Sequence, residues 1–221
     1  DLTDAVLQNI LIQVADASAA DSDILEITGT APDMTWLIDG PNSGTTSTGI
    51  VFQGIENLTG AADNQDTFRF DAAGGISGFI DGGAGGFDSL ELINGTFGLV
   101  TYTATGPDSG SIDRDGNLIT FAGLEPTTDN SAGNKVFNAT AGDDSISISG
   151  SGVSVTIAGA TFENITYSNP GNITVNAGGG ADQITIESLG TYAGTLTVNG
   201  DVGSDTLIVS QNVDMWLTGA D

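Results

Sequence analysis

Short runs in which apolar and polar residues alternate recur along most of this chain, and Gly, Asn, Asp and Ser separate them. The last third is the most regular, with the runs SISI, VSVTI, NITV, QITI and DTLIV. Strict alternation over a few residues is typical of β-strands that bury one face. The pattern therefore predicts an all-β fold made of many short strands.

The first residues follow a different period. Within residues 3–15, apolar side chains recur at helical spacing, at Val6, Leu7, Ile10, Leu11 and Val14. Thr3 or Asp4 can serve as the N-cap of such a helix. Residues 10–14 are also compatible with a strand, so both interpretations stand. We expect residues 1–20 to form a capping segment, with a helix that covers the first open edge of the β structure.

A longer repeat is superimposed on the alternation. TVNAGGGADQITI, from Thr174, returns as TVNGDVGSDTLIV from Thr197, which is 197 − 174 = 23 residues later, and VFNATAGDDSISI at 136–148 is a third copy. Matched positions of the three copies hold the same residue types: Asn138, Asn176 and Asn199; Gly142, Gly180 and Gly203; Asp144, Asp182 and Asp205. Two looser copies upstream place Asp66 and Asp88 at the Asp position.

Repetition at this distance predicts a parallel β-solenoid, of the β-helix or β-roll kind, with coils of about 23 residues. Each coil would hold two short strands, whose inward Ile, Leu and Val side chains form a narrow continuous core. A pair of antiparallel β-sandwiches is the competing architecture, because it also has evenly spaced short strands. The return of Asn, Gly and Asp in register favours the solenoid, in which the asparagines form a hydrogen-bonded ladder and the glycines shape the turns.

The regularity of the pattern divides the chain into three parts. After the capping segment, we expect residues 21–130 to form an irregular part of the solenoid, with a hairpin excursion at 97–120 around an Asp-Gly-Asn turn. Residues 131–221 are expected to form the regular repeats, and the boundary lies in the polar stretch PTTDNSAGN. The final LTGAD resembles the opening of the unit LTGAAD at 58–63, so we expect the sequence to stop inside a repeat.

Charge narrows the range of functions. The 221 residues carry 29 acidic and three basic side chains, for a net charge of −26, and include no cysteine or histidine. Such a surface repels nucleic acid and anionic membranes, and no apolar run is long enough for a membrane helix. Disulfides and sites built on thiolate or histidine are excluded. We expect no nucleic-acid partner and no direct membrane insertion, and a chain suited to salty or calcium-rich water, where ions screen its self-repulsion.

The repeated aspartates can have two roles. Each carboxylate can accept backbone N–H groups within its own turn, which is a structural role. Alternatively, the turns of adjacent coils hold calcium between them, because stacked strands lie about 4.8 Å apart and bare carboxylates at that distance repel each other. Calcium prefers oxygen ligands of this kind. The candidate calcium ligands are Asp66, Asp88, Asp144, Asp182 and Asp205.

Three stretches resemble a known motif. GAGGFDSLE at 83–91 is similar to the repeats-in-toxin (haemolysin-type) nonapeptide, Gly-Gly-x-Gly-x-Asp-x-apolar-x, with Ala84 at the second glycine. AGGGADQIT at 177–185 and GDVGSDTLI at 200–208 are degenerate versions of it. The resemblance implies calcium-binding loops in a parallel β-roll. In that family the nonapeptides follow one another in tandem, whereas here each stands alone within its repeat.

The wider pattern, from IENLTGAADNQDTFRF to TFAGLEP, is similar to giant secreted or surface adhesin-like proteins of Gram-negative bacteria. That resemblance implies an extracellular, cell-surface location and a non-enzymatic structural or adhesive role within a larger protein. The partner it implies is a cell-surface or matrix component, either a glycan or a protein.

Three alternatives stay open. The first is a fibre subunit that associates end to end through unpaired strand edges. The second is a polysaccharide-acting β-helix enzyme, which needs two suitably spaced carboxylates; no unique catalytic cluster stands out, so we expect no enzyme. The third is a carbohydrate-binding module that would stack sugars on Trp36, Trp216, Tyr102, Tyr167 and Tyr192.

Overall fold

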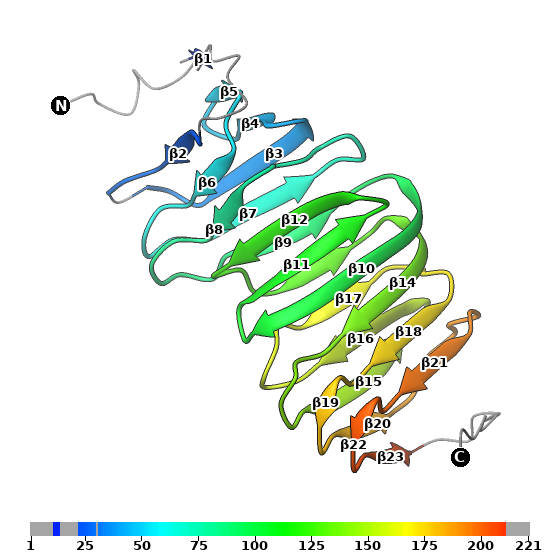
Figure 1. Cartoon of the computed structure of the whole chain (residues 1–221). Helices are drawn as coiled ribbons and strands as arrows, with labels where there is room; N and C mark the ends of the chain where they lie inside the picture. Colours follow the sequence, from blue (N-terminus) through cyan, green and yellow to red (C-terminus); the bar gives the residue numbers. More distant parts are fainter. Residues whose placement is uncertain (1–10, 14–21, 30, 211–221) are drawn as a thin grey trace.

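A computed structural model describes residues 11–13, 22–29 and 31–210 of the chain (Figure 1). All regular secondary structure in these ranges is β, which confirms the predicted all-β class. In chain order the strands are β1 (Leu11–Gln13), β2 (Ile24–Glu26), β3 (Met34–Gly40), β4 (Ser43–Thr46), β5 (Val51–Gln53), β6 (Asn57–Thr59), β7 (Asp66–Phe70), β8 (Phe79–Asp81), β9 (Ser89–Leu92), β10 (Thr96–Gly106), β11 (Ser109–Arg114), β12 (Asn117–Ala122), β13 (Thr127–Asp129), β14 (Ala132–Asn138), β15 (Ser145–Ser151), β16 (Ser154–Ala158), β17 (Ile165–Tyr167), β18 (Ile173–Asn176), β19 (Gly179–Gly180), β20 (Gln183–Ile186), β21 (Leu196–Asn199), β22 (Val202–Gly203) and β23 (Thr206–Val209).

These strands form two large sheets and one small one. A 12-stranded sheet has the order β1-β5-β4-β3-β7-β9-β13-β17-β16-β15-β20-β23, and a 9-stranded sheet has the order β2-β6-β8-β12-β11-β10-β14-β18-β21. The pair β19–β22 stands apart from both. The chain passes back and forth between the two large sheets, and Figure 1 shows the strands layered along an elongated molecule, with β2 and β6 near one end and β21 and β23 near the other.

Pairing within the sheets is mixed. Strands that follow a crossing between sheets pair in parallel with their predecessors, as β14 does with β10 and β18 does with β14. Three groups of three consecutive strands, β3–β5, β10–β12 and β15–β17, are antiparallel meanders. Purely parallel stacking is therefore not observed. The meander strands carry the same apolar alternation as the other strands, so periodicity alone did not distinguish them.

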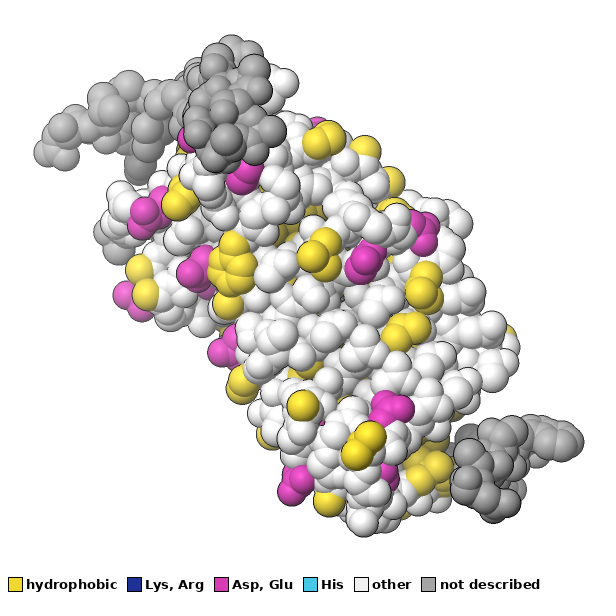
Figure 2. Space-filling view, in the orientation of Figure 1, with side chains coloured by type: hydrophobic (Ala, Val, Ile, Leu, Met, Phe, Trp, Pro, Cys, Tyr) yellow, Lys and Arg dark blue, Asp and Glu magenta, His cyan; other side chains and the backbone are white. Residues whose placement is uncertain are grey.

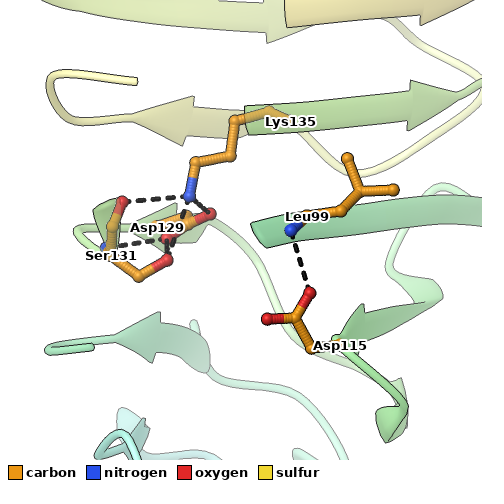
Figure 3. Close-up of polar contacts among 5 residues, drawn as sticks. All are labelled: Leu99, Asp115, Asp129, Ser131 and Lys135. Carbon is orange, nitrogen blue, oxygen red and sulfur yellow. Dashed lines mark hydrogen bonds and ion pairs between the residues drawn. The ribbon is translucent and has the colours of Figure 1, made fainter. Parts of the chain in front are cut away.

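One of the three meanders, β10–β12, covers the segment 97–120 that the sequence marked as a hairpin excursion. Its second turn contains Asp115 and Gly116, with φ of 52° and 94°, as a tight hairpin requires. The Asp115 carboxylate accepts the N–H groups of Gly98 at 2.8 Å and Leu99 at 2.9 Å. This side chain therefore ties the turn back to the start of the long strand β10 (Figure 3).

Within each meander, the order of the three strands in the sheet is the reverse of their order in the chain. β12 lies beside the earlier strand β8, while β10, made first, lies beside the later strand β14. β17 and β15 have the same relation to β13 and β20, and β5 and β3 to β1 and β7. The first strand of each meander therefore lies two positions further along the sheet than the third strand, and the second strand lies between them.

The meanders also explain why the repeat length varies. Equivalent residues are 22 apart between Asp66 and Asp88, and 23 apart between Asn176 and Asn199. Asn138 and Asn176 are 38 apart, because the meander β15–β17 intervenes. The predicted spacing of about 23 residues therefore describes the repeats that hold no inserted hairpin.

The predicted capping helix falls mostly outside the described residues. Within the described part, Leu11–Gln13 form strand β1, which pairs in parallel with Val51–Gln53 of β5. At these three positions the helical interpretation is wrong, and the strand interpretation of the same apolar run applies.

The core lies between the two large sheets and runs the length of the molecule. Inward positions alternate along each strand, so that β7, for example, buries every second residue. Aromatic rings stack across strand neighbours: Trp36 on Phe68 and Tyr102 on Phe137, both with ring centroids 5.3 Å apart. Such stacks add to the burial of the rings themselves.

Burial contradicts the use of these aromatic residues as a sugar platform. Trp36, Tyr102 and Tyr167 are fully buried. The hydroxyl group of Tyr192 donates to the carbonyl oxygens of Gly171 and Thr195, at 2.7 and 3.0 Å, so this ring is held at a corner of the fold. Trp216 lies outside the described residues.

Candidate metal centre

The repeated aspartates stack on one another along the 12-stranded sheet, where each lies at the first residue of a strand or directly before it. In each pair the later carboxylate accepts the backbone N–H of the earlier residue through Oδ1. Asp88 accepts from Asp66 at 2.7 Å, Asp182 from Asp144 at 2.7 Å, and Asp205 from Asp182 at 3.1 Å. One oxygen of each of these carboxylates therefore joins neighbouring repeats.

The second carboxylate oxygens, Oδ2, of these aspartates differ in whether they have a hydrogen-bond partner. Oδ2 of Asp66 accepts the N–H of Ala61, and Oδ2 of Asp144 accepts the N–H of Thr140, both at 2.9 Å within the residue's own turn. Oδ2 of Asp182 is buried and has no hydrogen-bond partner. The second oxygens of Asp66 and Asp144 thus shape their own turns, whereas Asp182 retains a free buried acceptor.

The glycines two residues before these aspartates allow the turns to touch. Gly180 has a φ of 123°, and a Cβ there would lie 2.6 Å from the carbonyl carbon of Gly142. A Cβ on Gly203 would overlap the carbonyl oxygen of Gly180. Close approach of backbones, in addition to the positive φ, requires glycine in these turns.

The three matched asparagines form a ladder on the 9-stranded sheet. The Nδ2 of Asn199 donates to Oδ1 of Asn176, and the Nδ2 of Asn176 donates to Oδ1 of Asn138, both at 2.7 Å. The ladder continues to Thr103 Oγ1, which accepts from Asn138 Nδ2 at 3.0 Å. The sequence did not indicate Thr103, because threonine replaces asparagine on β10.

Two glutamates that sequence reasoning missed occupy the aspartate position in the middle of the sheet. The pairing of Thr127 with Leu90 places Glu125 opposite Asp88, and the pairing of Ile165 with Thr127 places Glu163 opposite Glu125. The only shared signal is an apolar-Glu-x-x-Thr pattern in LEPTT and FENIT. IENLT carries the same pattern but lies on the 9-stranded sheet, so the signal is not specific.

Asp108, Glu125 and Glu163 bring three carboxylates together, which we call the acidic triad. Each offers an oxygen, and the three oxygens lie within 4.8 Å of one another. Asp108 comes from the turn between β10 and β11, and the glutamates precede β13 and β17. A cavity of about 150 Å³ beside them is lined by Asp88, Asp108, Glu125 and glycines that include Gly83 and Gly123.

The five predicted calcium ligands do not form such a group. Within the part of the chain that the structure describes, no three of Asp66, Asp88, Asp144, Asp182 and Asp205 bring carboxylate oxygens this close together. They form stacked pairs instead, each joined by one hydrogen bond between adjacent repeats.

Burial raises the pKa of several of these carboxyl groups. The pKa of Glu163 rises to about 8, first because the group is buried and then because Glu125 and Asp108 are negative; the Asn164 N–H opposes the rise. The pKa of Asp88 rises to about 6 by burial and by neighbouring carboxylates, against the hydrogen bond from Asp66. Burial also raises the pKa of Asp182, and Asp144 and other neighbours add to the rise.

The three basic side chains of the protein are all engaged elsewhere. Lys135 Nζ lies 2.7 Å from Asp129 Oδ2, with both side chains fully buried, and donates to the Ser131 carbonyl at 2.9 Å (Figure 3). Arg69 pairs with Glu91 at 2.9 Å. Arg114 donates to backbone carbonyls and lies 5.4 Å from the centroids of two phenylalanine rings.

The acidic side chains therefore have no internal cation beyond these pairs. Figure 2 shows carboxylates scattered over the visible face rather than gathered in one patch. A comparison of the chain with protein-family models, with curated proteins and with solved structures finds no match. Among the described residues there is no helix long and apolar enough to cross a bilayer.

Proposed function

We propose that this chain is a non-enzymatic, extracellular segment of a larger bacterial surface or matrix protein, with a structural or adhesive role, and that calcium stabilises it. The observation that carries the proposal is the use of its polar side chains to join repeats. The Asp stack and the Asn ladder each link successive strands by side-chain hydrogen bonds. These repeated aspartates and asparagines are thereby used in the fold itself, whereas catalytic groups need side chains that are free to act on a substrate.

A β-solenoid is the architecture that this proposal assumes. Repeated crossings between two sheets, with parallel pairing one position further along, support it. The three meanders are then hairpins inserted into coils of about 23 residues. The shared register of Asn138, Asn176 and Asn199 supports the coil assignment in the last third of the chain.

The motif resemblance and the acidic surface support an extracellular location. A net charge of −26 is screened best in water rich in salt or calcium. The partner class that follows is a cell-surface or matrix glycan or protein. Incubation with polyuronates and neutral glycans should give no turnover, and turnover that disappears on replacing a single aspartate would overturn the non-enzymatic assignment.

Calcium at the stacked aspartates is supported by Asp182, whose Oδ2 is buried without a partner next to Asp205 and Asp144. If the Kd is near 10⁻⁴ M, as in extracellular modules, about 10 mM calcium is a hundredfold excess and adds about 2.7 kcal/mol to the free energy of unfolding. We expect the melting temperature to rise by a few degrees per site in calcium relative to EDTA. Magnesium should do much less, since it requires tight octahedral geometry.

The matched variants for this test are Asp182→Asn and Asp205→Asn, melted in EDTA, calcium and magnesium at equal ionic strength. Loss of the calcium-induced rise in both variants supports the site. Equal melting temperatures of the unmodified chain in all three buffers would reduce these aspartates to turn-shaping residues.

A further inference from the structure

We propose that the acidic triad of Asp108, Glu125 and Glu163 is a calcium site that ties the β10–β11 turn of the 9-stranded sheet to two neighbouring strands of the 12-stranded sheet. The three ligands come from segments far apart in the sequence. None of them is the aspartate of a nonapeptide-like stretch. The proposal deepens the calcium stabilisation proposed above but rests on different residues, so the two can fail separately.

Glu163 is the first reason. Its side chain lies in the interior, with a residue exposure of only 4%. One of its carboxylate oxygens lies within 4.8 Å of an oxygen of Glu125 and an oxygen of Asp108, and the backbone N–H of Asn164 is the group that stabilises its charge. Burying an ionised carboxylate with so few hydrogen-bond donors or positive charges around it lowers the free energy of unfolding, unless a cation binds beside it.

The protein cannot supply that cation itself. Its sequence has three basic side chains, and Lys135, Arg69 and Arg114 are held by Asp129, by Glu91 and by backbone carbonyls. No other lysine or arginine exists anywhere in the 221 residues. A counter-charge for the ionised Glu163 carboxylate must therefore come from solution.

The ligand set selects the type of ion. It offers carboxylate oxygens only, without the nitrogen or sulfur donors that zinc and copper favour. The ligand oxygens lie within 4.8 Å of one another, which matches two oxygens each about 2.3–2.6 Å from one calcium ion. The open cavity beside Asp88 leaves room for the waters and carbonyls that complete a calcium shell.

Tyr102 provides a local reporter. Its buried ring lies next to the triad, since its hydroxyl group donates to the Glu163 carbonyl oxygen at 3.4 Å. Terbium(III), which replaces calcium at oxygen sites, is sensitised by a nearby tyrosine. Terbium bound to the full chain should therefore emit on tyrosine excitation, and added calcium should quench that emission by displacing it.

Five forms of the chain separate the outcomes. Glu163→Gln and Asp108→Asn should lose most of the Tyr102-sensitised emission. Tyr102→Phe should lose it too but keep the calcium-induced rise in melting temperature. The double variant Asp182→Asn/Asp205→Asn, which alters only the stacked aspartates, should keep the emission of the unmodified chain.

A second readout covers the chance that a variant binds terbium weakly for structural reasons. In EDTA, Glu163→Gln should melt above the unmodified chain, because it removes a carboxyl group whose ionised form is disfavoured by burial, whereas in calcium it should lose that advantage. The proposal is overturned if Glu163→Gln and Asp108→Asn both keep the full emission, or if Glu163→Gln keeps the full calcium-induced rise. Should Glu163→Gln not fold, the surface variant Asp108→Asn decides alone.

Discussion

Lys135 and Asp129 show how a single pair of residues is used in this fold. The chain has one lysine, and it forms a fully buried ion pair that links the consecutive strands β13 and β14, which belong to different sheets. Ser131 satisfies the remaining donors through its carbonyl and hydroxyl oxygens. Removing one partner of such a pair leaves the other charge buried and alone.

We therefore expect Lys135→Met to lower the free energy of unfolding by about 3–5 kcal/mol. The control is Arg69→Met, which breaks the half-exposed pair with Glu91 and should cost less than about 1 kcal/mol. Urea denaturation of both variants measures the difference. Equal losses would mean that burial of the Lys135 pair has no energetic consequence.

At the scale of turns and strands, the glycine positions show which parts of the repeat are sterically constrained. Gly180 meets the backbone of the turn before it and has a positive φ, whereas the matched Gly142 has neither restriction. The fold therefore requires glycine for steric reasons at position 180 but not at the equivalent position 142.

Gly180→Ala should destabilise the protein by about 1 kcal/mol or more, because the side chain meets backbone and the φ is unfavourable. Gly142→Ala should change stability by less than about 0.5 kcal/mol or slightly increase it. Thermal melting of the two variants makes the comparison directly. If Gly142→Ala proves as damaging as Gly180→Ala, close packing of these turns is not the cause.

The predictable elements were those in which residue identity repeats. Asn176 and Asn199 were found because both residue type and spacing recur, and their side chains do meet. Glu125 and Glu163 were missed because glutamate and a different preceding residue replace the Gly-x-Asp pattern. Asp108 reaches the triad only through the tertiary position of a hairpin turn, which no local pattern encodes.

At the scale of the whole molecule, the excess of acidic groups makes stability depend on pH. A carboxyl group whose pKa is higher in the folded state binds more protons there than in the unfolded chain, so stability falls as pH rises between the two values. For Glu163 that interval runs from its ordinary value of 4.5 to about 8. Asp88 acts in the same direction between 3.8 and about 6.

In EDTA we expect the free energy of unfolding to fall from pH 5 towards pH 8, with a slope that approaches about 1.4 kcal/mol per pH unit for one group. Glu163→Gln should flatten most strongly the part above about pH 7, where Asp88, with a pKa of about 6, is nearly fully ionised. Denaturation at a series of pH values tests this, and an unchanged slope in the variant would assign the effect to other carboxyl groups.

The reversed strand order of the meanders has a consequence for how the chain folds from its N-terminal end. β10 precedes β11 and β12 in the chain, yet the strand that pairs with β8 is β12, and β10 lies two positions further from β8. A stack growing from the first strand therefore cannot accept β10 on arrival, and must wait until the whole meander has emerged and docks as one unit. Growth of the stack from its N-terminal end should thus advance by single strands between meanders and pause at β3–β5, β10–β12 and β15–β17, where three strands are added together.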